Sequence, residues 1–282
     1  MASDVTVMGG GIFGLACAWE MTRRGARVRL VERDRIGAGA SGGVVGALAP
    51  HAPERWTPLK AFQLDSLLAQ QAFWAEVAAA GGVDPGYART GRLQPVADAE
   101  ALARAEARAE EAAQRWGAAA VWRVIPAAEA GDWAPASPTG WLVHDTLSAR
   151  LSPSRACAAL AAALRARGAE VVEGGGAPGP GPVLWATGAA GLAALSEATG
   201  RAAGRGVKGQ AALLALDRSD APQLYADGLH VVPHADGTVA VGSTTERDFA
   251  DPTAIDAQLD AVIARARAAV PALADAPVVA RW

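Results

Sequence analysis

The feature that most constrains this chain is a set of three N-terminal glycines, spaced as G-x-G-x-x-G behind a short apolar run. Gly9, Gly11 and Gly14 follow that run, a helix-like segment ends at Gly25, and a second apolar run ends at Glu32. Strand, glycine turn, helix, strand and an acid about 20 residues on form the pattern of a dinucleotide-binding unit. The sequence therefore predicts that the chain binds ADP-ribose in some form.

Each part of this unit has a physical task. Gly9 allows the tight turn, Gly11 lets a pyrophosphate approach the backbone, and Gly14 lets helix and strand pack closely. The N-terminus of the helix offers free N–H groups and a positive dipole end to the phosphates. We expect the Glu32 carboxylate to accept hydrogen bonds from the ribose hydroxyls.

Composition limits the classes of protein that this chain can belong to. Its 282 residues are 51% hydrophobic and 20% charged, which suits a globular protein with a sizeable core and two domains. The net charge is −3, so no positive field of the size that nucleic acid requires is expected. The first strand begins within a few residues of Met1, and the apolar run 9–21 is too short to span a bilayer. We expect a cytoplasmic protein without a membrane segment.

Two further observations concern ligands of other kinds. Cys17 and Cys157 lie far apart in helix-like segments, so we expect two buried free thiols in a reducing compartment. No metal site is predicted. Residues 37–49 carry no charge and are rich in glycine and alanine, which lets backbone approach a flat ligand. We interpret this loop as a flavin cradle; a flexible linker is the alternative, but Val44, Val45 and Leu48 favour burial.

Apolar periodicity and turn residues predict the remaining elements. Helices are expected at 57–80, 99–116, 153–167 and 256–270. Strands are expected at 169–173, 183–188, 212–216, 229–233 and 239–243, with a turn at 234–238. The chain thus alternates a parallel βαβ half with an antiparallel half, twice over. This order predicts two domains, each built from separate segments of the chain.

Several short motifs share one order along the chain: GAS at 39–41, GALAPH at 46–51, GRL at 91–93, ATG at 186–188, VKGQ at 207–210 and a hairpin over 225–242. Together with the glycine turn they resemble the FAD-dependent D-amino acid oxidase superfamily, and within it the glycine oxidase-like and sarcosine oxidase-like enzymes. The resemblance covers nearly the whole chain. It implies an α/β fold in which a Rossmann-like FAD-binding domain (GR2-type, residues 1–80 and 146–203) is interleaved with an α+β substrate domain. The substrate domain, residues 81–145 and 204–282, is expected to be built on an antiparallel sheet.

The resemblance implies FAD as the cofactor, with contacts from five places: the pyrophosphate (Gly9, Gly11, Ile12, Phe13, Gly14), the adenosine ribose (Glu32, Arg33), the phosphate bridge (Ala40, Ser41), the isoalloxazine ring (Val45, Gly46, Ala47, Leu48) and the ADP half (Gly188). It also implies that a Cα hydrogen of a small amino acid or amine (glycine, sarcosine or a D-amino acid) leaves as hydride to the flavin. The imine then hydrolyses, and oxygen or another acceptor reoxidises the cofactor. Oxidase and dehydrogenase activity both stay open, as does the oligomeric state.

Two histidines are the candidate catalytic residues. His230 falls where glycine oxidase has a substrate-binding tyrosine, and a histidine can still donate a hydrogen bond there. A purely structural role on its strand is the alternative. His51 directly follows the flavin loop and serves either catalysis or the holding of that loop. Because the cofactor carries the hard chemistry, a tuned general base is not required.

Besides His230, the chain departs from the family pattern in two further places. In the family an arginine that clamps the substrate carboxylate follows the final tryptophan, and then comes a glycine-rich closing segment. This sequence stops at Trp282, so we expect a truncated version that binds FAD poorly and turns over little. Residues 174–182, GGGAPGPGP, bypass a hairpin that contacts adenine in relatives. Two alternatives stay open: the oxidative domain of a tRNA-uridine modification enzyme, and a non-catalytic flavin-fold remnant that binds a partner.

Overall fold

The computed structural model describes residues 3–282, which separate into two compact units. The first unit comprises Met1–Gly43, Phe73–Pro85 and Ser152–Lys208. The second comprises Val44–Ala72, Gly86–Leu151 and Gly209–Trp282. The predicted division differs from these units mainly in residues 44–72, which cluster with the second unit and not with the first.

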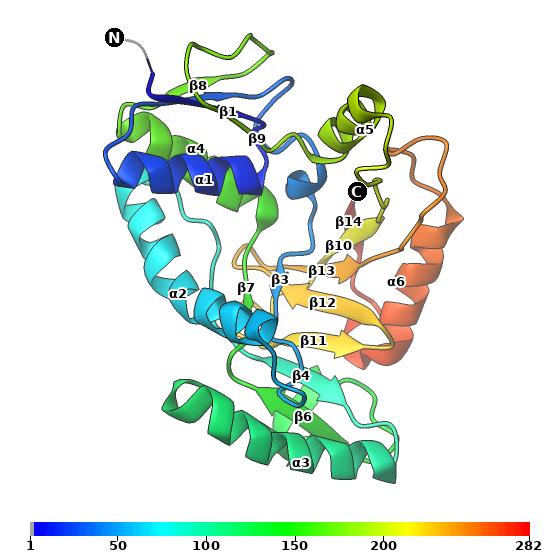
Figure 1. Ribbon diagram of the computed structural model, residues 1–282. Coiled ribbons are helices and arrows are strands. Elements are labelled where there is room, and N and C mark those ends of the chain that lie inside the picture. Colours follow the sequence, from blue (N-terminus) through cyan, green and yellow to red (C-terminus); the bar gives the residue numbers. More distant parts are fainter. Residues whose placement is uncertain (1–2) are drawn as a thin grey trace. The chain divides into compact units, whose positions relative to one another are not determined.

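A four-stranded parallel sheet forms the centre of the first unit (Figure 1). Its strands run in the order β8 (Glu170–Val172), β2 (Val28–Val31), β1 (Val5–Met8) and β9 (Val183–Trp185). All three pairings are parallel, with Val7 beside Leu30 of β2 and Leu184 of β9. Parallel strands need crossover connections, and α1 supplies one between β1 and β2. This is the βαβ order that the sequence predicts.

Helices cover this sheet. Figure 1 shows α1 (Ile12–Arg23) and α4 (Pro153–Ala166) side by side below the strands, and the two helices contact each other. Leu15 and Trp19 of α1 are fully buried, and α4 buries seven of its residues, most of them alanines. The end of α2 (Pro58–Gly81) approaches closely, since a Cβ on Gly81 would lie 2.5 Å from the amide nitrogen of Ala163. The helix α5 (Gly188–Thr199) follows β9 and buries no residue.

An eight-stranded sheet forms the second unit. Its strands run in the order β14 (Val278–Arg281), β10 (Ala211–Ala215), β13 (Thr238–Gly242), β12 (Leu229–Pro233), β11 (Gln223–Ala226), β4 (Arg92–Pro95), β6 (Trp141–Asp145) and β5 (Trp122–Pro126). The predicted antiparallel sheet is therefore mixed, because β4 and β11 pair in parallel. A separate small sheet pairs β3 (Ala47–Leu48) with β7 (Ala149–Arg150).

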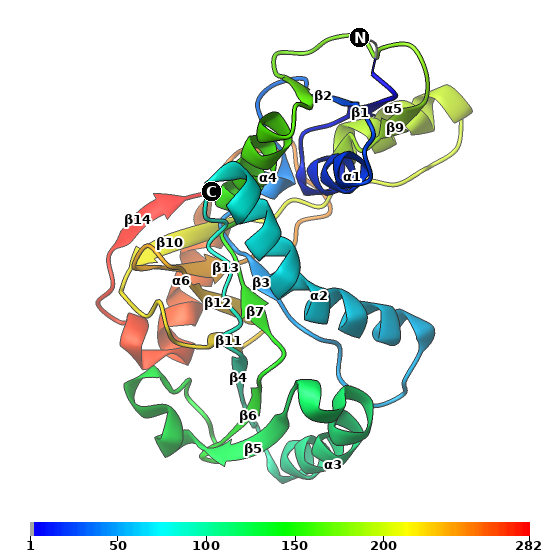
Figure 2. The ribbon, with the colours of Figure 1, turned by 90° about the vertical axis from the view of Figure 1, so that its left-hand side faces the viewer.

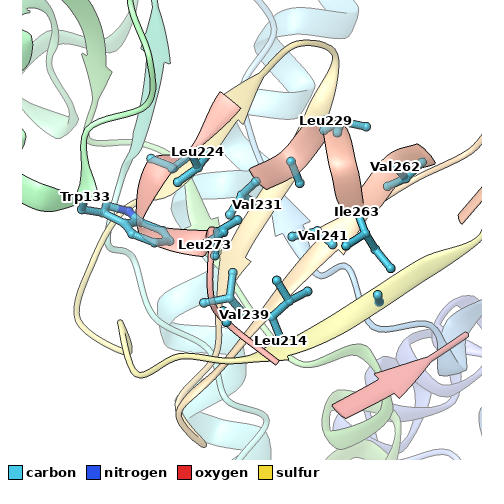
Figure 3. Packing of buried hydrophobic residues seen from close by; sticks show 14 of the residues in the cluster. Trp133, Leu214, Leu224, Leu229, Val231, Val239, Val241, Val262, Ile263 and Leu273 are labelled. Carbon is cyan, nitrogen blue, oxygen red and sulfur yellow. The ribbon is translucent and has the colours of Figure 1, made fainter. Parts of the chain in front are cut away.

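The main core of the second unit lies between one face of the large sheet and α6 (Ala257–Ala269) (Figure 3). Alternate strand residues face this helix, namely Leu214, Leu224, Leu229, Val231, Val239 and Val241. Because successive strand residues point to opposite faces, Tyr225, His230 and Gly242 belong to the other face of the sheet. The alternation of apolar residues along these strands thus determines which side chains lie on the sheet face opposite α6.

A second core lies beneath α3 (Ala99–Trp116) in the same unit. Figure 2 shows this helix beside β5, and Trp116 meets Trp122 edge to face with ring centroids 6.0 Å apart. Asp98 caps α3 by accepting from the Ala101 amide at 2.7 Å. The sequence predicted α3 with its observed bounds but not β5, β14 or α5. In residues 3–282 no helix is both long and apolar enough to cross a membrane.

Candidate functional site

The glycine turn after β1 is too crowded for side chains. Gly9 has a φ of +114°, and a Cβ there would lie 2.3 Å from the carbonyl oxygen of Ala186. A Cβ on Gly14 would lie 1.9 Å from the Gly9 carbonyl oxygen, well inside van der Waals contact. Both positions therefore require glycine, for the tight turn and for close packing respectively, as the sequence predicts.

The N-terminus of α1 is open toward an anion. Its N-cap residue, Gly11, has no side chain to bond the first turn, and no acidic residue lies in that turn. The Ile12 amide donates to Ser41 Oγ at 3.0 Å, and a Cβ on Gly11 would lie 3.1 Å from the same oxygen. Because helical bonding starts from the Gly11 carbonyl, the Phe13 and Gly14 amides have no acceptor within the helix. These N–H groups and the helix dipole suit a phosphate.

Glu32 lies at the end of β2, beside this turn. Its Oε2 accepts from the Gly10 amide at 2.6 Å, and its Oε1 accepts from the Asp34 amide at 3.0 Å. Each carboxylate oxygen keeps a further lone pair, so the group can still accept a hydroxyl hydrogen. The glycine-rich segment 174–182 also contacts this residue, since the Gly175 amide donates to the Glu32 carbonyl at 2.9 Å.

Three other residues that the sequence predicts to contact FAD make fewer contacts with the glycine turn. Arg33 is exposed and pairs with its neighbour Asp34, so its side chain lies in solvent. Ala40 is exposed within the short 3-10 turn that carries Ser41. Gly188 begins α5, two residues beyond the Ala186 carbonyl that meets Gly9.

The predicted ring-binding segment, residues 45–48, belongs to the second unit and is held by its backbone. The Gly46 carbonyl accepts from the Leu151 amide at 2.9 Å, and Ala47 pairs with Arg150. The Leu48 carbonyl accepts from Gln223 Nε2 at 3.0 Å. Residues 46–48, near the end of the glycine-rich uncharged loop, are therefore held by the segment 150–151 and by Gln223 of β11.

Val45 connects this segment to the face of the large sheet that points away from α6. A Cβ on Gly242 would lie 2.8 Å from Val45 Cγ2, so Val45 packs directly on Gly242. His230 is the residue opposite Gly242 in the β12–β13 register. The structure therefore brings the predicted ring-binding segment and the candidate catalytic His230 onto one face of one sheet.

The His230 ring is half-buried beside an aromatic neighbour. Tyr225 stands opposite on β11, with ring centroids 4.9 Å apart. Burial, and secondarily the positive charge of Arg92, lower the pKa of His230 from its usual value of 6.5. Its buried Nδ1 has no hydrogen-bond partner within residues 3–282. At neutral pH His230 is thus a neutral imidazole whose buried Nδ1 has no protein partner.

His51 has a different environment. It is exposed, and both its backbone amide (2.7 Å) and its ring Nδ1 (2.6 Å) contact Oε1 of Gln63 on α2. Gln63 in turn reaches the Ala49 carbonyl at 3.4 Å. These contacts tie the segment after Leu48 to the helix, which supports the loop-holding role that the sequence left open.

The two cysteines lie outside the contacts described so far. Cys157 is buried, and burial raises the pKa of its thiol to about 11. Cys17 is only half-buried, which corrects the prediction of two buried thiols, because its position on α1 is not fully covered. No group of three or more metal-ligating side chains occurs in the described part of the chain.

Four residues of this arrangement were missed from the sequence: Gly10, Gln63, Arg92 and Gln223. Gly10 carried a signal, since it completes a run of three glycines, and a Cβ there would lie 2.9 Å from the Glu32 Cβ. Arg92 lies in the GRL motif at 91–93, but the motif gave this side chain no role. Gln63 and Gln223 act through contacts between separate segments, for which the sequence alone holds no marker.

A parallel sheet with a glycine turn at an uncapped helix N-terminus defines the class of dinucleotide-binding proteins. Within that class, residues 4–282 match the family described as "FAD dependent oxidoreductase", and the chain belongs to this family. It is therefore an oxidoreductase with FAD as its cofactor.

Known relatives agree with this assignment. Glycine oxidase from Geobacillus kaustophilus (strain HTA426) is 30% identical over 92 residues, a match that spans 32% of this chain and 24% of that protein. The crystal structure of glycine oxidase from Geobacillus kaustophilus has a TM-score of 0.82 at 23% identity, covering 99% of this chain and 81% of that one. Iminodiacetate oxidase from Chelativorans sp. BNC1 has a TM-score of 0.79 at 22% identity, covering 98% and 81%. At these identities the two structures show a shared fold.

Proposed function

We propose that this protein oxidises the C–N bond of a small amino acid or amine, such as glycine, sarcosine or a D-amino acid, with hydride passing to the flavin. The observation that carries the proposal is the packing of Val45 on Gly242, directly opposite His230. The segment proposed to follow the ring and the side chain proposed to contact substrate therefore belong to one sheet face, which supports the proposal. The likeness to glycine oxidase and iminodiacetate oxidase supports the same class of substrate.

The first unit is proposed to hold the ADP half of FAD. The residues present fit that group, because Gly11 leaves room that a Cβ would fill and the first-turn amides of α1 have no partner within the helix. Ser41 already bonds the Ile12 amide there, and its hydroxyl can also donate to a phosphate oxygen. Glu32 would bind the ribose from the end of β2. When bound, FAD supplies the hydride acceptor, which no side chain can provide.

The second unit is proposed to hold the substrate. Here Val45 and Leu48 would line the ring with apolar groups, while the backbone bonds of Gly46 and Leu48 keep the segment in place. His230, neutral at pH 7, would hydrogen-bond the substrate and so orient its Cα–H bond. His51 would act at a distance as a positioning residue, because its contact with Gln63 fixes the loop beyond Leu48.

Anaerobic reduction tests this function. The FAD-loaded protein is mixed with glycine, sarcosine, iminodiacetate or D-alanine without oxygen, and the visible absorbance of the flavin is followed. At least one of these amines is expected to bleach the flavin. His230→Phe should slow bleaching at unchanged FAD affinity, whereas His144→Gln, a histidine paired with Arg123 elsewhere in the unit, should not. Absence of bleaching by every amine would contradict the proposal.

A further inference from the structure

The first part of helix α2 has an exposed apolar face. Residues 58–72 of this helix belong to the second unit, and one side of them packs on the core beneath α3 through Leu64 and Leu67. On the opposite side, Leu59 is 66% exposed and Phe62 is 72% exposed. These two residues are three positions apart, so they lie side by side on the helix surface. A helix that is apolar on opposite sides is expected to be covered on both.

The rest of this exposed face is nearly free of charge. Its other residues are the small Ser66, Ala69 and Ala72 and one acid, Asp65. The small side chains leave room for another segment to lie close to the helix, because the distance between packed helices depends on the side chains at the contact. Large apolar residues that are exposed together mark an interaction surface.

Arg55, just before the helix, is an exposed cation in a fixed segment. Lys60 Nζ donates to the Ala52 carbonyl at 2.7 Å and also to the Glu54 carbonyl. The Glu54 carboxylate accepts from Arg108 Nε at 2.9 Å. Arg55 itself has a φ of +51°, in the left-handed region that residues other than glycine seldom adopt. The contacts on either side therefore hold Arg55 in a defined position.

Arg55 and Asp65 are both left without a partner. Within residues 3–282 neither side chain forms an ion pair or a hydrogen bond, and both residues are exposed. Glu110 and Glu111 line the same cavity as Arg55, of about 760 Å³, but form no ion pair with it. The chain thus carries an unpaired cation before the two exposed apolar residues and an unpaired anion after them.

We propose that this face binds a second copy of the chain, with the two α2 helices antiparallel about a two-fold axis. In such a contact the same surface serves both partners, so it must be complementary to itself. Reversal of the second helix sets Leu59 of one chain against Phe62 of the other, and Arg55 against Asp65. Both pairs are centred near residue 60, so one axis accounts for the apolar contacts and for the charges.

The expected dimer is weak. Residues 58–72 span about 22 Å of helix. A contact of this length lies at or below the roughly 1,200 Å² that stable interfaces bury. Four apolar side chains at its centre, flanked by two ion pairs, are expected to give a dissociation constant on the order of 10 μM. The inference goes beyond the proposed function and does not depend on it.

Sedimentation velocity tests the association. The purified chain, with FAD present, is examined from about 1 to 100 μM, on either side of the expected dissociation constant. The parent protein should pass from the mass of one chain to that of two. Phe62→Glu places a charge at the centre of the contact and should bind at least about tenfold more weakly. Leu195→Glu, at a residue of α5 that is 52% exposed, is the matched control and should dimerise like the parent.

Charge exchange tests the antiparallel arrangement. Arg55→Asp and Asp65→Arg each set like charges against each other, so each should weaken association roughly two- to tenfold. The double variant restores opposite charges and should recover the affinity of the parent. Glu110→Gln removes an acid near Arg55 that has no place in the contact, and it should change nothing. All three residues are exposed, so these variants are expected to fold.

Two results would overturn the inference: a parent protein that stays monomeric up to about 100 μM, or a folded Phe62→Glu protein that dimerises as tightly as the parent. A monomer that instead binds vesicles of phosphatidylcholine and phosphatidylglycerol through Phe62 would assign the face to a membrane surface and equally reject the second copy. A double charge variant that does not recover would reject the antiparallel pairing. None of these measurements involves turnover, so their outcome is independent of the bleaching test.

Discussion

Oε2 of Glu32 accepts a hydrogen bond from the Gly10 amide at 2.6 Å, which fixes the acid at the end of β2 against the glycine turn that follows β1. The contact joins the two parts of the sequence pattern that lie 22 residues apart. Asp34 donates to the other oxygen, so the carboxylate is oriented before any ligand arrives. Pre-orientation of this kind lowers the entropy cost of binding.

Removal of this carboxylate should weaken FAD binding. Glu32→Ala loses a charged acceptor, and hydrogen bonds to charged groups contribute about 1.5–3 kcal/mol, or roughly 10–100-fold in affinity. Quenching of FAD fluorescence during a titration measures the effect. Glu76→Ala, which removes an exposed partner of Arg23 in the same unit, is the control and should bind FAD normally. Equal FAD affinity in both variants would show that Glu32 does not contact the cofactor.

Gly14 should be intolerant of any side chain. In Gly14→Ala the new Cβ would lie 1.9 Å from the Gly9 carbonyl oxygen, so α1 must move away from the turn. We expect a loss of about 1–3 kcal/mol in the free energy of unfolding, together with weaker FAD binding. Gly39→Ala places its Cβ in open space and serves as the control. Urea denaturation of both variants measures the free energy of unfolding. A Gly14→Ala protein as stable as Gly39→Ala would contradict the close packing of Gly14 on the Gly9 carbonyl.

His230 should titrate below the ordinary histidine pKa of 6.5. Burial, and then Arg92, lower its pKa from 6.5, so in an NMR titration its ring resonances should have a midpoint below that value. In acid the unfolded chain, with a histidine pKa of about 6.5, takes up this proton more readily than the folded chain does. The contribution of His230 to folding stability is therefore complete above that pH and declines as the pH falls through it. A midpoint above 6.5 would contradict the buried placement.

The two thiols should differ in reactivity. Burial raises the pKa of Cys157 to about 11, so at pH 8 it is almost entirely a protonated thiol behind covering residues. Cys17 is half-buried and more accessible. Ellman's reagent on the native protein should therefore modify one thiol per chain, and both in denaturant. The Cys17→Ser variant should be unreactive while folded; rapid reaction of that variant would show that Cys157 on α4 is not buried.

Local patterns predicted much of this structure. The glycine turn, the flanking strands β1 and β2, and the bounds of α3 are encoded by neighbours in sequence, so the pattern alone indicates them. The strands β5 and β14 were missed because they are short and depend on pairing with β6 and β10, whose positions the sequence does not state. The parallel pairing of β4 with β11 was missed for the same reason.

The residues of the candidate site fall into the same two groups, those that a local motif predicts and those whose contacts depend on the fold. Gly9, Gly14, Glu32 and Ser41 were predicted by motif, and each meets the glycine turn or the N-terminus of α1. Gln223 was missed, because its contacts with the Leu48 and Ala149 carbonyls depend on the fold that brings these three segments together. A local sequence motif can predict a backbone binding turn. Side chains that meet across several strands of a sheet can be identified only once the fold is known.

Competition between nucleotides tests the central claim most directly, namely that the glycine turn and Ser41 hold the ADP half of FAD. FAD is titrated into the purified chain, and ADP and FMN are then added as competitors. The account predicts saturable FAD binding that ADP displaces, with FMN, which lacks the adenosine part, binding far more weakly. A protein that binds no FAD, or that binds FMN as well as FAD, would contradict it.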